Sequence, residues 1–569
     1  MSEAKEFKYI GQRTIRPDGY DKVTGRATYG ADLSLPGMIW GKTLRSPHAH
    51  AKIVSIDTSK AEAHPDVMAV ATFQDFVTLQ SESIAGGEGA ADVLDVARNC
   101  LADDKVLYHG HAIAAIAART ERAAKDALAL IDVTYEILPP VMYVEEAMKE
   151  SAPVLHEDMF TNGYDEKPSK ASNIATRVEM KMGDVDAGFA DADVIVEREF
   201  RTPTAHQGYI EPHACTVTYS EDGQSMVWCC TQGHFDVRTL TAKVLGMDLG
   251  KLKVIASEIG GGFGGKTVIY QEPVALVLSK KSGRPVKMVM ERDEVFIATG
   301  PTSAAKLKAK VGIKKDGTIT AMQGWMAYEA GAFKGSPMMP GVMTMFTPYD
   351  CPNVLVEGFD VVVNKSKVAA YRAPGAPQAE YAAEMVINEL AEMLGMDPIE
   401  LRLKNAAKEG TQTIYGPKLK RVGLIECLEA AKNSPHYQSA LPEGQGRGLA
   451  AGFWFNVGGQ SSVTVNMNPD GTGTIVEGSP DIGGSRASMQ MMAAEVLQIE
   501  PKNLKPIIAD TENLPYSQGT GGSRTTFATG MAVIEASEKV VAQVKERAAA
   551  VWNVTAEQVE YADGVARNT

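Results

Sequence analysis

Cysteine is scarce in this sequence, and its spacing does not suit a metal cluster. The six cysteines are Cys100, Cys215, Cys229, Cys230, Cys351 and Cys427. Their separations match neither paired CxxC zinc sites nor iron–sulfur ligand runs. If electrons pass through this protein, their onward carriers must therefore lie on another chain. Free cysteines are usually small buried side chains, and we expect most of these six to be so.

Excess positive charge and long apolar runs are also absent. The sequence has 57 Lys and Arg against 71 Asp and Glu, a formal net charge of -14, which on average repels nucleic-acid phosphates and anionic membranes. No apolar run approaches the roughly 20 residues that a bilayer span needs, and the start MSEAKEFKYI lacks the apolar stretch of a secretory signal. We therefore predict a cytoplasmic protein with no nucleic-acid partner and no membrane partner.

The length of the chain indicates several domains. A chain of 569 residues with 44% hydrophobic residues can bury a large core and divides into about two to four domains. Residues 1–138 alternate short apolar runs with one helix-like stretch and predict an α/β domain. Residues 139–173 are rich in Pro, Lys, Glu and Asp and predict an extended connection. Residues 174–410 and 411–569 are then expected to form two further α+β domains.

Asp-Gly turns between strand-like runs support this division. They occur at Asp222-Gly223, Asp316-Gly317 and Asp470-Gly471, each flanked by alternating residues as in a β-hairpin. The last two share a hairpin-then-glycine layout, which hints at two related halves. A further Asp563-Gly564 turn opens a hairpin, and we expect no returning strand after it. An unpaired last strand indicates a split gene or a truncated fragment.

A glycine-rich loop at residues 260–265 (GGGFGG) lies between a strand-like and a helix-like run. Gly260, Gly262 and Gly265 fit the dinucleotide pattern GxGxxG, and residues 260–267 fit the P-loop pattern GxxxxGK[ST]. Glycines let backbone N–H groups approach a phosphate near a helix N-terminus. Neither the acidic strand end of a dinucleotide fold nor the magnesium-binding aspartate of a P-loop enzyme follows at a suitable place. A tight glycine turn between packed elements is the third interpretation.

Three more glycine-rich loops precede predicted helices, in AYRAPGAPQ, PDIGGSRASM and GTGGSRTTF. In the first, Pro377 suits the start of a helix, Ala382, Val386 and Leu390 repeat at helical spacing, and Gly395 can cap its end. Several backbone nests beside Arg372 and Arg524 suit one long ligand with more than one phosphate.

These segments, in this order, resemble a known family. AHQGYIEPH, WCCTQGHFDVR, GGGFGGK, AYRAPGAPQ and GTGGSR together are similar to the molybdopterin-binding large subunit of the xanthine dehydrogenase and aldehyde oxidoreductase family. The N-terminal GQRTIRPDGYDKVTGRATYGADL and LRSPHAHAKI resemble its first domain. The resemblance implies an α+β protein with a hammerhead-like α/β domain followed by two related molybdopterin-binding α+β domains, the last incomplete.

The resemblance also implies the site residues. The metal is held by a pterin dithiolene, with no side chain as a direct ligand, so His206 and His213 are expected to pack loops rather than bind metal. Gln232 would hydrogen-bond the apical oxo group of molybdenum, although a buried amide that satisfies backbone groups is the plain alternative. The residues implied to bind the cofactor are Gly262, Phe263, Gly264, Arg372, Gly521, Gly522, Ser523, Arg524, Thr525 and Thr526.

The implied activity is the hydroxylation of an N-heterocycle, an aldehyde or a related electron-poor carbon, with water as the oxygen source. The implied cofactor is molybdenum-molybdopterin cytosine dinucleotide. Electrons would pass to an iron–sulfur subunit and an FAD subunit. Ala373 stands where copper-binding members carry cysteine, and Thr267 where purine-oxidising members commonly carry glutamate. A copper site is therefore not expected, and purine specificity does not carry over.

One expected feature of the family is missing. The general-base glutamate normally follows in a GxGE-like motif, and no such motif follows Thr526. Glu535, Glu538 and Glu546 have the spacing of solvated charges on an amphipathic helix. A second chain could carry the C-terminal molybdopterin-domain segment. The alternatives are a non-catalytic cofactor-binding or assembly protein that has lost the base, and a P-loop nucleotide hydrolase that depends on Lys266.

Overall fold

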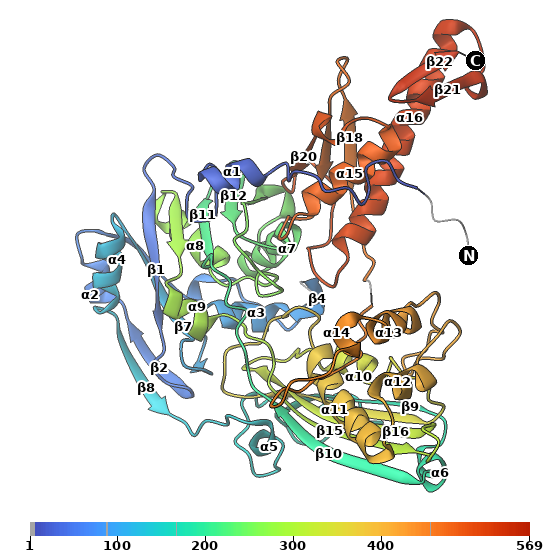
Figure 1. Cartoon of the computed structure of the whole chain (residues 1–569). Helices are drawn as coiled ribbons and strands as arrows, with labels where there is room; N and C mark the ends of the chain where they lie inside the picture. Colours follow the sequence, from blue (N-terminus) through green and yellow to red (C-terminus); the bar gives the residue numbers. More distant parts are fainter. Residues whose placement is uncertain (1–5, 87–88, 167, 456, 569) are drawn as a thin grey trace.

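The structure is a computed structural model that describes residues 6–86, 89–166, 168–455 and 457–568. The described residues form one seven-stranded sheet, one five-stranded sheet, two three-stranded sheets and two two-stranded sheets, and Figure 1 shows their arrangement. Helices and strands alternate along the chain, and the predicted α+β class is confirmed. Within the described residues, no helix is both long enough and apolar enough to cross a membrane.

The seven-stranded sheet joins strands from both sides of the predicted connection at residues 139–173. Its order is β13-β12-β11-β14-β1-β7-β3, and β1 pairs in parallel with β14 in its middle. Its strands are β1 (Ile39–Arg45), β3 (Val67–Thr72), β7 (Ala112–Ala118), β11 (Ala214–Thr218), β12 (Ser225–Cys229), β13 (Leu252–Ala256) and β14 (Val286–Val289). The N-terminal unit therefore shares one sheet with residues 214–289.

Strand β7 lies in the buried interior of this sheet. All seven residues of AIAAIAA are buried, because α8 (Glu272–Ser282) packs on one face and α4 (Glu121–Leu128) on the other. Ala115 faces the core cluster that contains α8, and Ile116 faces the cluster that contains α4. Covered faces on both sides explain why β7 lacks the polar alternation of a half-exposed strand.

Smaller elements surround this sheet. Two further sheets have the orders β6-β2-β8 and β4-β5, from β2 (Ala51–Asp57), β4 (Ser83–Gly86), β5 (Gly89–Asp92), β6 (Lys105–Val106) and β8 (Asp132–Ile137). The accompanying helices are α1 (Gly19–Thr24), α2 (Ser59–Glu62), α3 (Val93–Cys100), α7 (His234–Leu245) and α9 (Arg292–Ala298).

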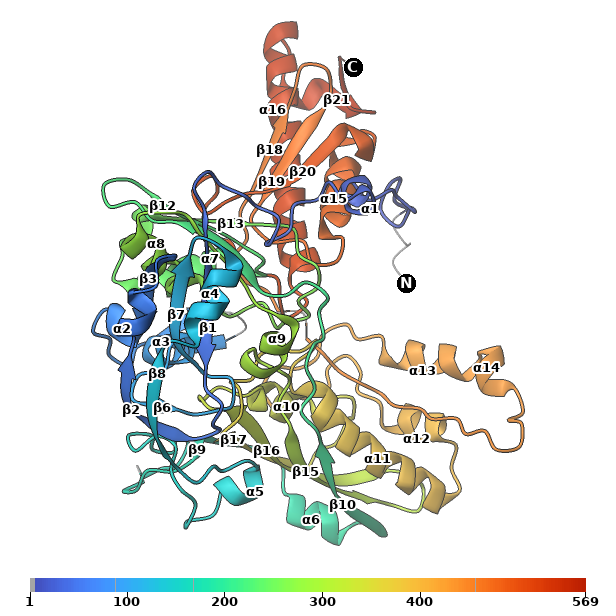
Figure 2. The same ribbon diagram turned by 90° about the vertical axis from the view of Figure 1, so that its left-hand side faces the viewer.

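The five-stranded sheet forms the lower part of Figure 2, with the order β10-β15-β16-β17-β9. Its hairpin at Asp316-Gly317 confirms the turn prediction. The long helix α11 packs on one face, and α5 with the chain near Leu155 packs on the other. The elements are β9 (Ile174–Met182), β10 (Val194–Thr202), β15 (Ala305–Ile313), β16 (Ile319–Gly331), β17 (Val354–Val362), α5 (Val144–Ala147), α6 (Val185–Ala190), α10 (Met338–Thr344) and α11 (Ala376–Leu394).

Helix α11 follows the sequence prediction closely. Pro377 lies in its first turn, and Gly395 ends it in the left-handed conformation with φ of 61°. Its Ala382, Val386 and Leu390 are fully buried. After it come α12 (Pro398–Asn405), α13 (Leu424–Lys432) and α14 (Pro435–Gln438), which lie beside one another in Figure 2.

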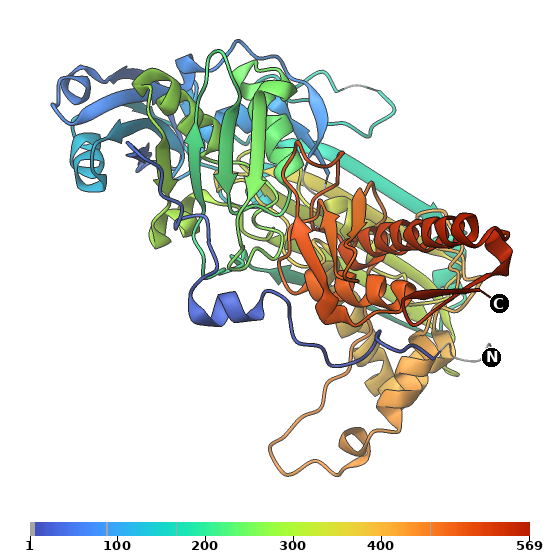
Figure 3. The same cartoon turned by 90° about the horizontal axis from the view of Figure 1, so that it is seen from above.

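The C-terminal unit is built on the sheet β18-β19-β20. Its elements are β18 (Val463–Met467), β19 (Gly473–Glu477), β20 (Leu504–Ile508), α15 (Ser485–Leu497), α16 (Gly530–Trp552), β21 (Val559–Ala562) and β22 (Val565–Asn568). The N-terminal segment lies against this unit (Figure 3), and the backbone N–H of Tyr9 donates to Glu495 on α15 at 2.7 Å.

The prediction that the last turn has no returning strand is wrong. Strand β22 pairs antiparallel with β21, from Val559 opposite Asn568 to Ala562 opposite Val565. Asp563 and Gly564 both have positive φ, 52° and 76°, as a two-residue type I′ turn requires. The chain therefore reverses within two residues, and its last strand is paired.

The two halves suggested by the hairpin-then-glycine layout have a common element order. In the first, β15 and β16 form a hairpin, α10 follows, β17 pairs in parallel with β16, and α11 comes next. In the second, the same order is β18, β19, α15, β20 and α16, with β20 parallel to β19. In the first half β10 and β9 extend the sheet beyond β15 and β17. Within the described residues, β18 and β20 have no such outer strands.

Candidate functional site

Loops from three parts of the chain enclose one cavity of about 600 Å³, which we call the loop cavity. It lies where the loop at residues 260–267, the loop before α11 and the loops of the C-terminal unit meet. The predicted site residues that line it are Gln232, Phe263, Gly264, Arg372, Gly521, Gly522, Ser523, Arg524, Thr525 and Thr526. Gly262 does not line it. The structure thus brings together segments that are far apart in the sequence.

The loop cavity also has lining residues that the sequence analysis did not assign. They are Ala373, Trp454, Ile482, Gly483, Gly484, Ser485, Ser488 and Thr520. The glycine-rich PDIGGSR segment was recognised in the sequence as one of the loops before helices, but none of its residues was assigned to the cofactor. Trp454 lies in the aromatic run FWF, which was a usable signal.

Gln232 connects two walls of the loop cavity. Its side chain is 1% exposed. Its Oε1 accepts hydrogen bonds from the backbone N–H groups of Gly264 (2.9 Å) and Lys266 (3.3 Å), and its Nε2 donates to Thr520 O at 2.7 Å. The amide therefore does satisfy backbone groups, as the plain alternative expected. Because an amide nitrogen has two N–H donors, one remains beyond the bond to Thr520.

The glycines beside Gln232 are required by close packing. A Cβ at Gly262 would lie 2.4 Å from Gln232 Oε1. A Cβ at Gly264, where φ is +108°, would lie 2.5 Å from Ala370 O. Real Cβ atoms do not approach oxygen so closely. The glycine run thus allows this loop to contact both Gln232 and the segment before α11.

Strained backbone is concentrated at the loop cavity. Phe263 (φ 55°), Arg372 (42°), Ala373 (63°) and Ser523 (60°) all adopt the left-handed region without being glycine, and all four line the cavity. Such residues cost about 1–3 kcal/mol each and cluster at functional sites. A hydrogen bond from Arg372 N to Phe263 O at 2.9 Å joins two of the strained positions.

The two predicted arginines behave differently. Arg524 is 1% exposed, and its guanidinium donates to Gly458 O (3.2 Å), Gln518 O (2.7 Å) and Gln460 O (2.8 Å). It is therefore a positioning residue that holds the loops of the C-terminal unit together. Arg372 is exposed at the cavity, and within the described part of the chain its guanidinium forms no ion pair. Arg372 is thus available to an anionic ligand.

Two hydroxyls in the lining lack partners. Thr525 Oγ1 and Ser485 Oγ are buried and make no hydrogen bond with any residue that the structure describes. Buried polar groups normally have partners, and an unpartnered one indicates a ligand or a functional role. With Arg372, and with the buried charge of Arg524 that no described carboxylate pairs, they suit an elongated anionic ligand.

One of the backbone loops expected to bind an anion, the loop before α15, already binds a carboxylate of the protein. At the start of α15, the carboxylate of Asp481 accepts the backbone N–H groups of Gly483 (3.0 Å), Ser485 (3.0 Å) and Arg486 (3.2 Å). These donors are therefore not free for a phosphate. The bonds hold the pKa of Asp481 below its usual value despite burial.

The P-loop interpretation of residues 260–267 fails on two observations. Lys266 Nζ lies 2.6 Å from Glu211 Oε2, and this ion pair is almost completely buried. Helix α8 begins only at Glu272, whose carboxylate accepts the N–H of Tyr270 at 3.0 Å. Neither a free lysine nor a free helix N-terminus faces the loop, so the helix-dipole part of the phosphate prediction is wrong here.

The histidines pack loops, as predicted. His213 Nε2 lies 2.8 Å from the Tyr209 hydroxyl, and His206 Nε2 lies 2.9 Å from Thr299 Oγ1. Burial lowers the pKa of His206 to about 4. No group of three or more potential metal-ligating side chains occurs among the residues described. Five of the six cysteines are buried, which confirms the expectation for most of them, and Cys427 is exposed.

A second cavity, which we call the apolar chamber, lies on the other side of the same loops. Its volume is about 550 Å³. Thr267, Ala370 and Pro374 line it, whereas their neighbours Gly264, Arg372 and Ala373 line the loop cavity. The apolar chamber therefore adjoins the loop cavity across one thin layer of backbone. Its other walls include Leu240, Ile269, Met339, Met343 and Phe455.

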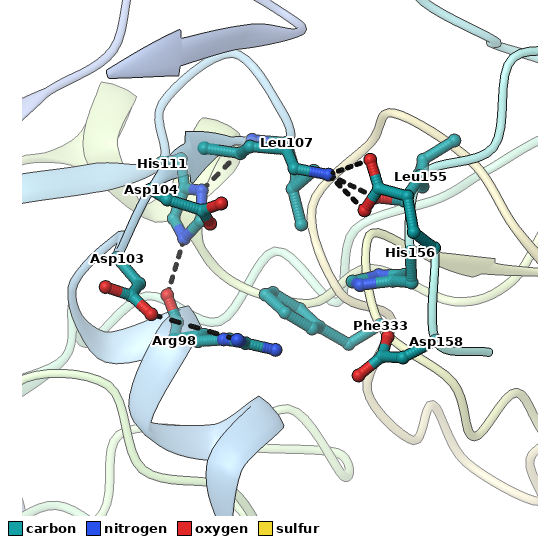
Figure 4. A pocket seen from close by; sticks show the side chains of 11 residues that line it. Arg98, Asp103, Asp104, Leu107, His111, Leu155, His156, Asp158 and Phe333 are labelled. Atoms are coloured by element: carbon teal, nitrogen blue, oxygen red, sulfur yellow. Dashed lines mark hydrogen bonds and ion pairs between the residues drawn. The ribbon is translucent and has the colours of Figure 1, made fainter. Parts of the chain in front are cut away.

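A smaller cavity of about 220 Å³ lies behind Phe333, which also lines the apolar chamber. Figure 4 shows Phe333 between the Arg98 side and the His156 side of this cavity. His111 accepts the N–H of Leu107 at 3.2 Å and contacts Arg98 O at 2.7 Å, and burial lowers its pKa to about 4. Lys105, which also lines this cavity, donates to Leu155 O at 3.3 Å and pairs with Glu157, and it thereby joins the connection at residues 139–173 to the N-terminal unit.

The family is identified by comparison with known proteins. Residues 24–139 match the model "Aldehyde oxidase and xanthine dehydrogenase, a/b hammerhead domain", and residues 166–406 and 428–569 match two models of a "Molybdopterin cofactor-binding domain". A probable xanthine dehydrogenase subunit of Bacillus subtilis (strain 168) is 31% identical, over 96% of this chain and 72% of that protein. The nicotinate dehydrogenase large molybdopterin subunit of Eubacterium barkeri is 34% identical, over 75% of this chain and 96% of that protein.

Solved structures agree. The quinoline 2-oxidoreductase of Pseudomonas putida 86 matches with a TM-score of 0.88 and 25% identity, over 99% of this chain and 74% of that chain. The aldehyde oxidoreductase of Desulfovibrio gigas matches with a TM-score of 0.84 and 26% identity, over 98% of this chain and 64% of that one. The chain belongs to the xanthine dehydrogenase and aldehyde oxidoreductase family, as a molybdopterin-binding large subunit with a hammerhead domain and two molybdopterin-binding domains.

Proposed function

We propose that this chain is the molybdenum-cofactor subunit of a hydroxylase that oxidises an electron-poor carbon of an N-heterocycle, an aldehyde or a related compound, with water as the oxygen source. The observation that carries the proposal is the loop cavity, where the predicted residues of three distant segments meet. Its strained backbone, unpartnered hydroxyls and free Arg372 fit an elongated anionic cofactor. When bound, the molybdenum cofactor supplies the two-electron oxidation.

We assign the cofactor contacts by residue. The second amide N–H of Gln232, with Phe263 and Gly264, is proposed to lie at the metal end. Arg372 is proposed to contact the pterin. Residues 521–526 are proposed to hold the pyrophosphate and the nucleotide, whose base we take to be cytosine. Arg524 positions these loops, and Thr525 Oγ1 and Ser485 Oγ supply two donors that have no other partner among the described residues.

The apolar chamber is the proposed substrate site. It borders the loop cavity through residues 264–267 and 370–374, and its largely apolar walls suit a flat ring and exclude water. Relatives whose names specify quinoline and nicotinate are consistent with a ring substrate. Thr267, whose hydroxyl donates to Gly264 O at 2.8 Å, gives no carboxylate for a purine.

We further propose that a companion chain completes the C-terminal unit and carries the general-base glutamate. In the first half, β10 and β9 protect the edges of β15 and β17, whereas β18 and β20 lack outer strands among the described residues. Open sheet edges invite strand pairing with another polypeptide. An iron–sulfur subunit and an FAD subunit are the proposed electron acceptors, and relatives are named as subunits of complexes. The complex is proposed to be cytoplasmic.

The experiment that tests this function is the metal content of the complex purified with cofactor maturation intact. We expect one molybdenum per protomer by mass spectrometry of the metal. Arg372→Ala removes an exposed cation at the cavity and should lower the molybdenum content at least threefold. Arg122→Ala, which removes an exposed side chain of α4, should not lower it. A wild-type complex without molybdenum would contradict the proposal and favour a non-catalytic assembly role.

A further inference from the structure

The apolar chamber contains one ammonium group that forms no ion pair with a carboxylate among the described residues. Lys367 Nζ donates to Gly335 O at 2.8 Å and to Val368 O at 3.2 Å, and it forms no ion pair within the described residues. An ammonium has three N–H donors, so one donor remains. Backbone carbonyls carry no net charge, and Asp360 and Asp95 act on Lys367 only from a distance, so its ammonium has no carboxylate in contact within the described residues.

The other lysine of the apolar chamber is already paired. Lys334 Nζ lies 3.0 Å from Asp92 Oδ2 and 3.9 Å from Asp95 Oδ2. Burial, together with Asp92, raises the pKa of Asp95. Of the two lysines and two aspartates that line the apolar chamber, Lys334 pairs with the aspartates, whereas Lys367 forms no ion pair within the described residues.

The loop beside Lys367 is held in place and offers a second donor. The carboxylate of Asp360 accepts the backbone N–H groups of Gly335 and Ser336, each at 2.8 Å. Ser336 Oγ is buried and has no hydrogen-bond partner among the described residues, and it belongs to the lining of the same cavity as Lys367. An ammonium donor and a hydroxyl that are both without a partner thus lie at adjoining places in the wall of this cavity, since Lys367 contacts Gly335.

We propose that Lys367 is a specificity-determining residue that selects ring substrates carrying an anionic substituent of the carboxylate class. The inference rests on the proposed function, since it takes the apolar chamber as the substrate site. The apolar walls hold the ring, and Lys367 with Ser336 binds the substituent by charge-assisted hydrogen bonds. A carboxylate of the substrate forms an ion pair with the Lys367 ammonium, whereas a neutral amide of the same shape cannot.

The preference should depend on pH. Burial lowers the pKa of Lys367 to about 8. The charged groups around Lys367 are Asp360 on β17, Asp95 on α3, Asp92 before α3 and Lys334 after β16. Below pH 8 the ammonium is charged and binds a carboxylate, and above it this attraction is lost. A preference for a carboxylate should therefore disappear between about pH 7 and about pH 9.5.

The test compares two probes on the purified holo complex by calorimetry, pyridine-3-carboxylate and pyridine-3-carboxamide. At pH 7 we expect the carboxylate to bind at least tenfold more tightly. Lys367→Met should bring the ratio close to one, Lys367→Arg should retain most of it, and the surface variant Lys408→Met should leave it unchanged.

Equal binding of the two probes, no binding of either, or a ratio that Lys367→Met leaves intact would overturn the inference. The molybdenum content of the same samples separates the two failures. A complex that contains molybdenum but lacks the preference contradicts only the role of Lys367. A natively matured complex without molybdenum contradicts the proposed function itself.

Discussion

At the scale of single residues, the site is defined by side chains that hold backbone in place. Gln232 binds two N–H groups on one loop and a carbonyl on another, and Arg524 binds the carbonyls of the C-terminal unit. The sequence could single out both residues, because they lie in recognisable motifs. It could not show that Arg524 contacts protein carbonyls rather than a phosphate, because those carbonyls belong to loops whose positions depend on the folded chain.

Gln232→Ala should destabilise the protein by about 3 kcal/mol, because it leaves buried backbone donors and an acceptor without partners. Chemical unfolding followed by circular dichroism measures the change. Gln12→Ala, at an exposed position, is the control and should cost less than about 0.5 kcal/mol. Equal losses in the two variants would show that Gln232 does not join the two walls of the loop cavity.

At the scale of elements, local patterns predicted the parts that local chemistry determines. The hairpins at Asp222-Gly223, Asp316-Gly317 and Asp470-Gly471 formed where expected, as did α11. The last hairpin was misjudged, since a four-residue strand after the Asp563-Gly564 turn is enough to pair. The sequence predicted a helix directly after the glycine-rich loop at residues 260–265, but α8 begins only at Glu272. The glycine pattern alone does not show that Glu272 caps the backbone there.

Gly264→Ala should distort the loop that separates the loop cavity from the apolar chamber. The new Cβ would lie 2.5 Å from Ala370 O, and the backbone φ of +108° is strained for alanine. We therefore expect the free energy of unfolding to fall by more than about 2 kcal/mol. Gly283→Ala is the matched control, since Gly283 also has positive φ but open space around its Cβ, and should cost about 1 kcal/mol. Thermal unfolding of both variants measures the difference, and similar losses would show that the predicted clash is relieved by loop movement.

At the scale of the whole molecule, the domain pattern and the sheet pattern differ. The predicted bounds 1–138, 139–173, 174–410 and 411–569 remain predictions, while the seven-stranded sheet joins strands from the first and third of these segments. The sequence could not reveal the pairing of β1 with β14, because pairing between distant strands leaves no local periodicity. The meeting of three distant loops was predicted only through the resemblance to a family.

A buried ion pair of the first molybdopterin-binding domain holds the chain at residues 449–451, which belong to the second. Arg402 and Glu384 lie 2.6 Å apart with side chains 1% and 5% exposed, and Glu384 also accepts Ala451 N at 2.6 Å. Glu384→Ala should lower the free energy of unfolding by about 3–5 kcal/mol, because it leaves a buried guanidinium unpaired. It should also release the chain near residue 451, and hydrogen exchange of the backbone there measures that release. Asp316→Ala, which breaks the exposed pair with Lys404, should cost less than about 1 kcal/mol, and comparable losses would contradict the role of the buried pair.

The central claim is that loops from three parts of the chain hold one molybdenum-pterin dinucleotide. The most direct measurement is the molar ratio of molybdenum and of cytidine monophosphate released by acid from the complex purified with its maturation system. The account predicts one of each per protomer, and a parallel loss of both in Arg372→Ala. A complex that contains neither, or that contains molybdenum without any nucleotide, would contradict it.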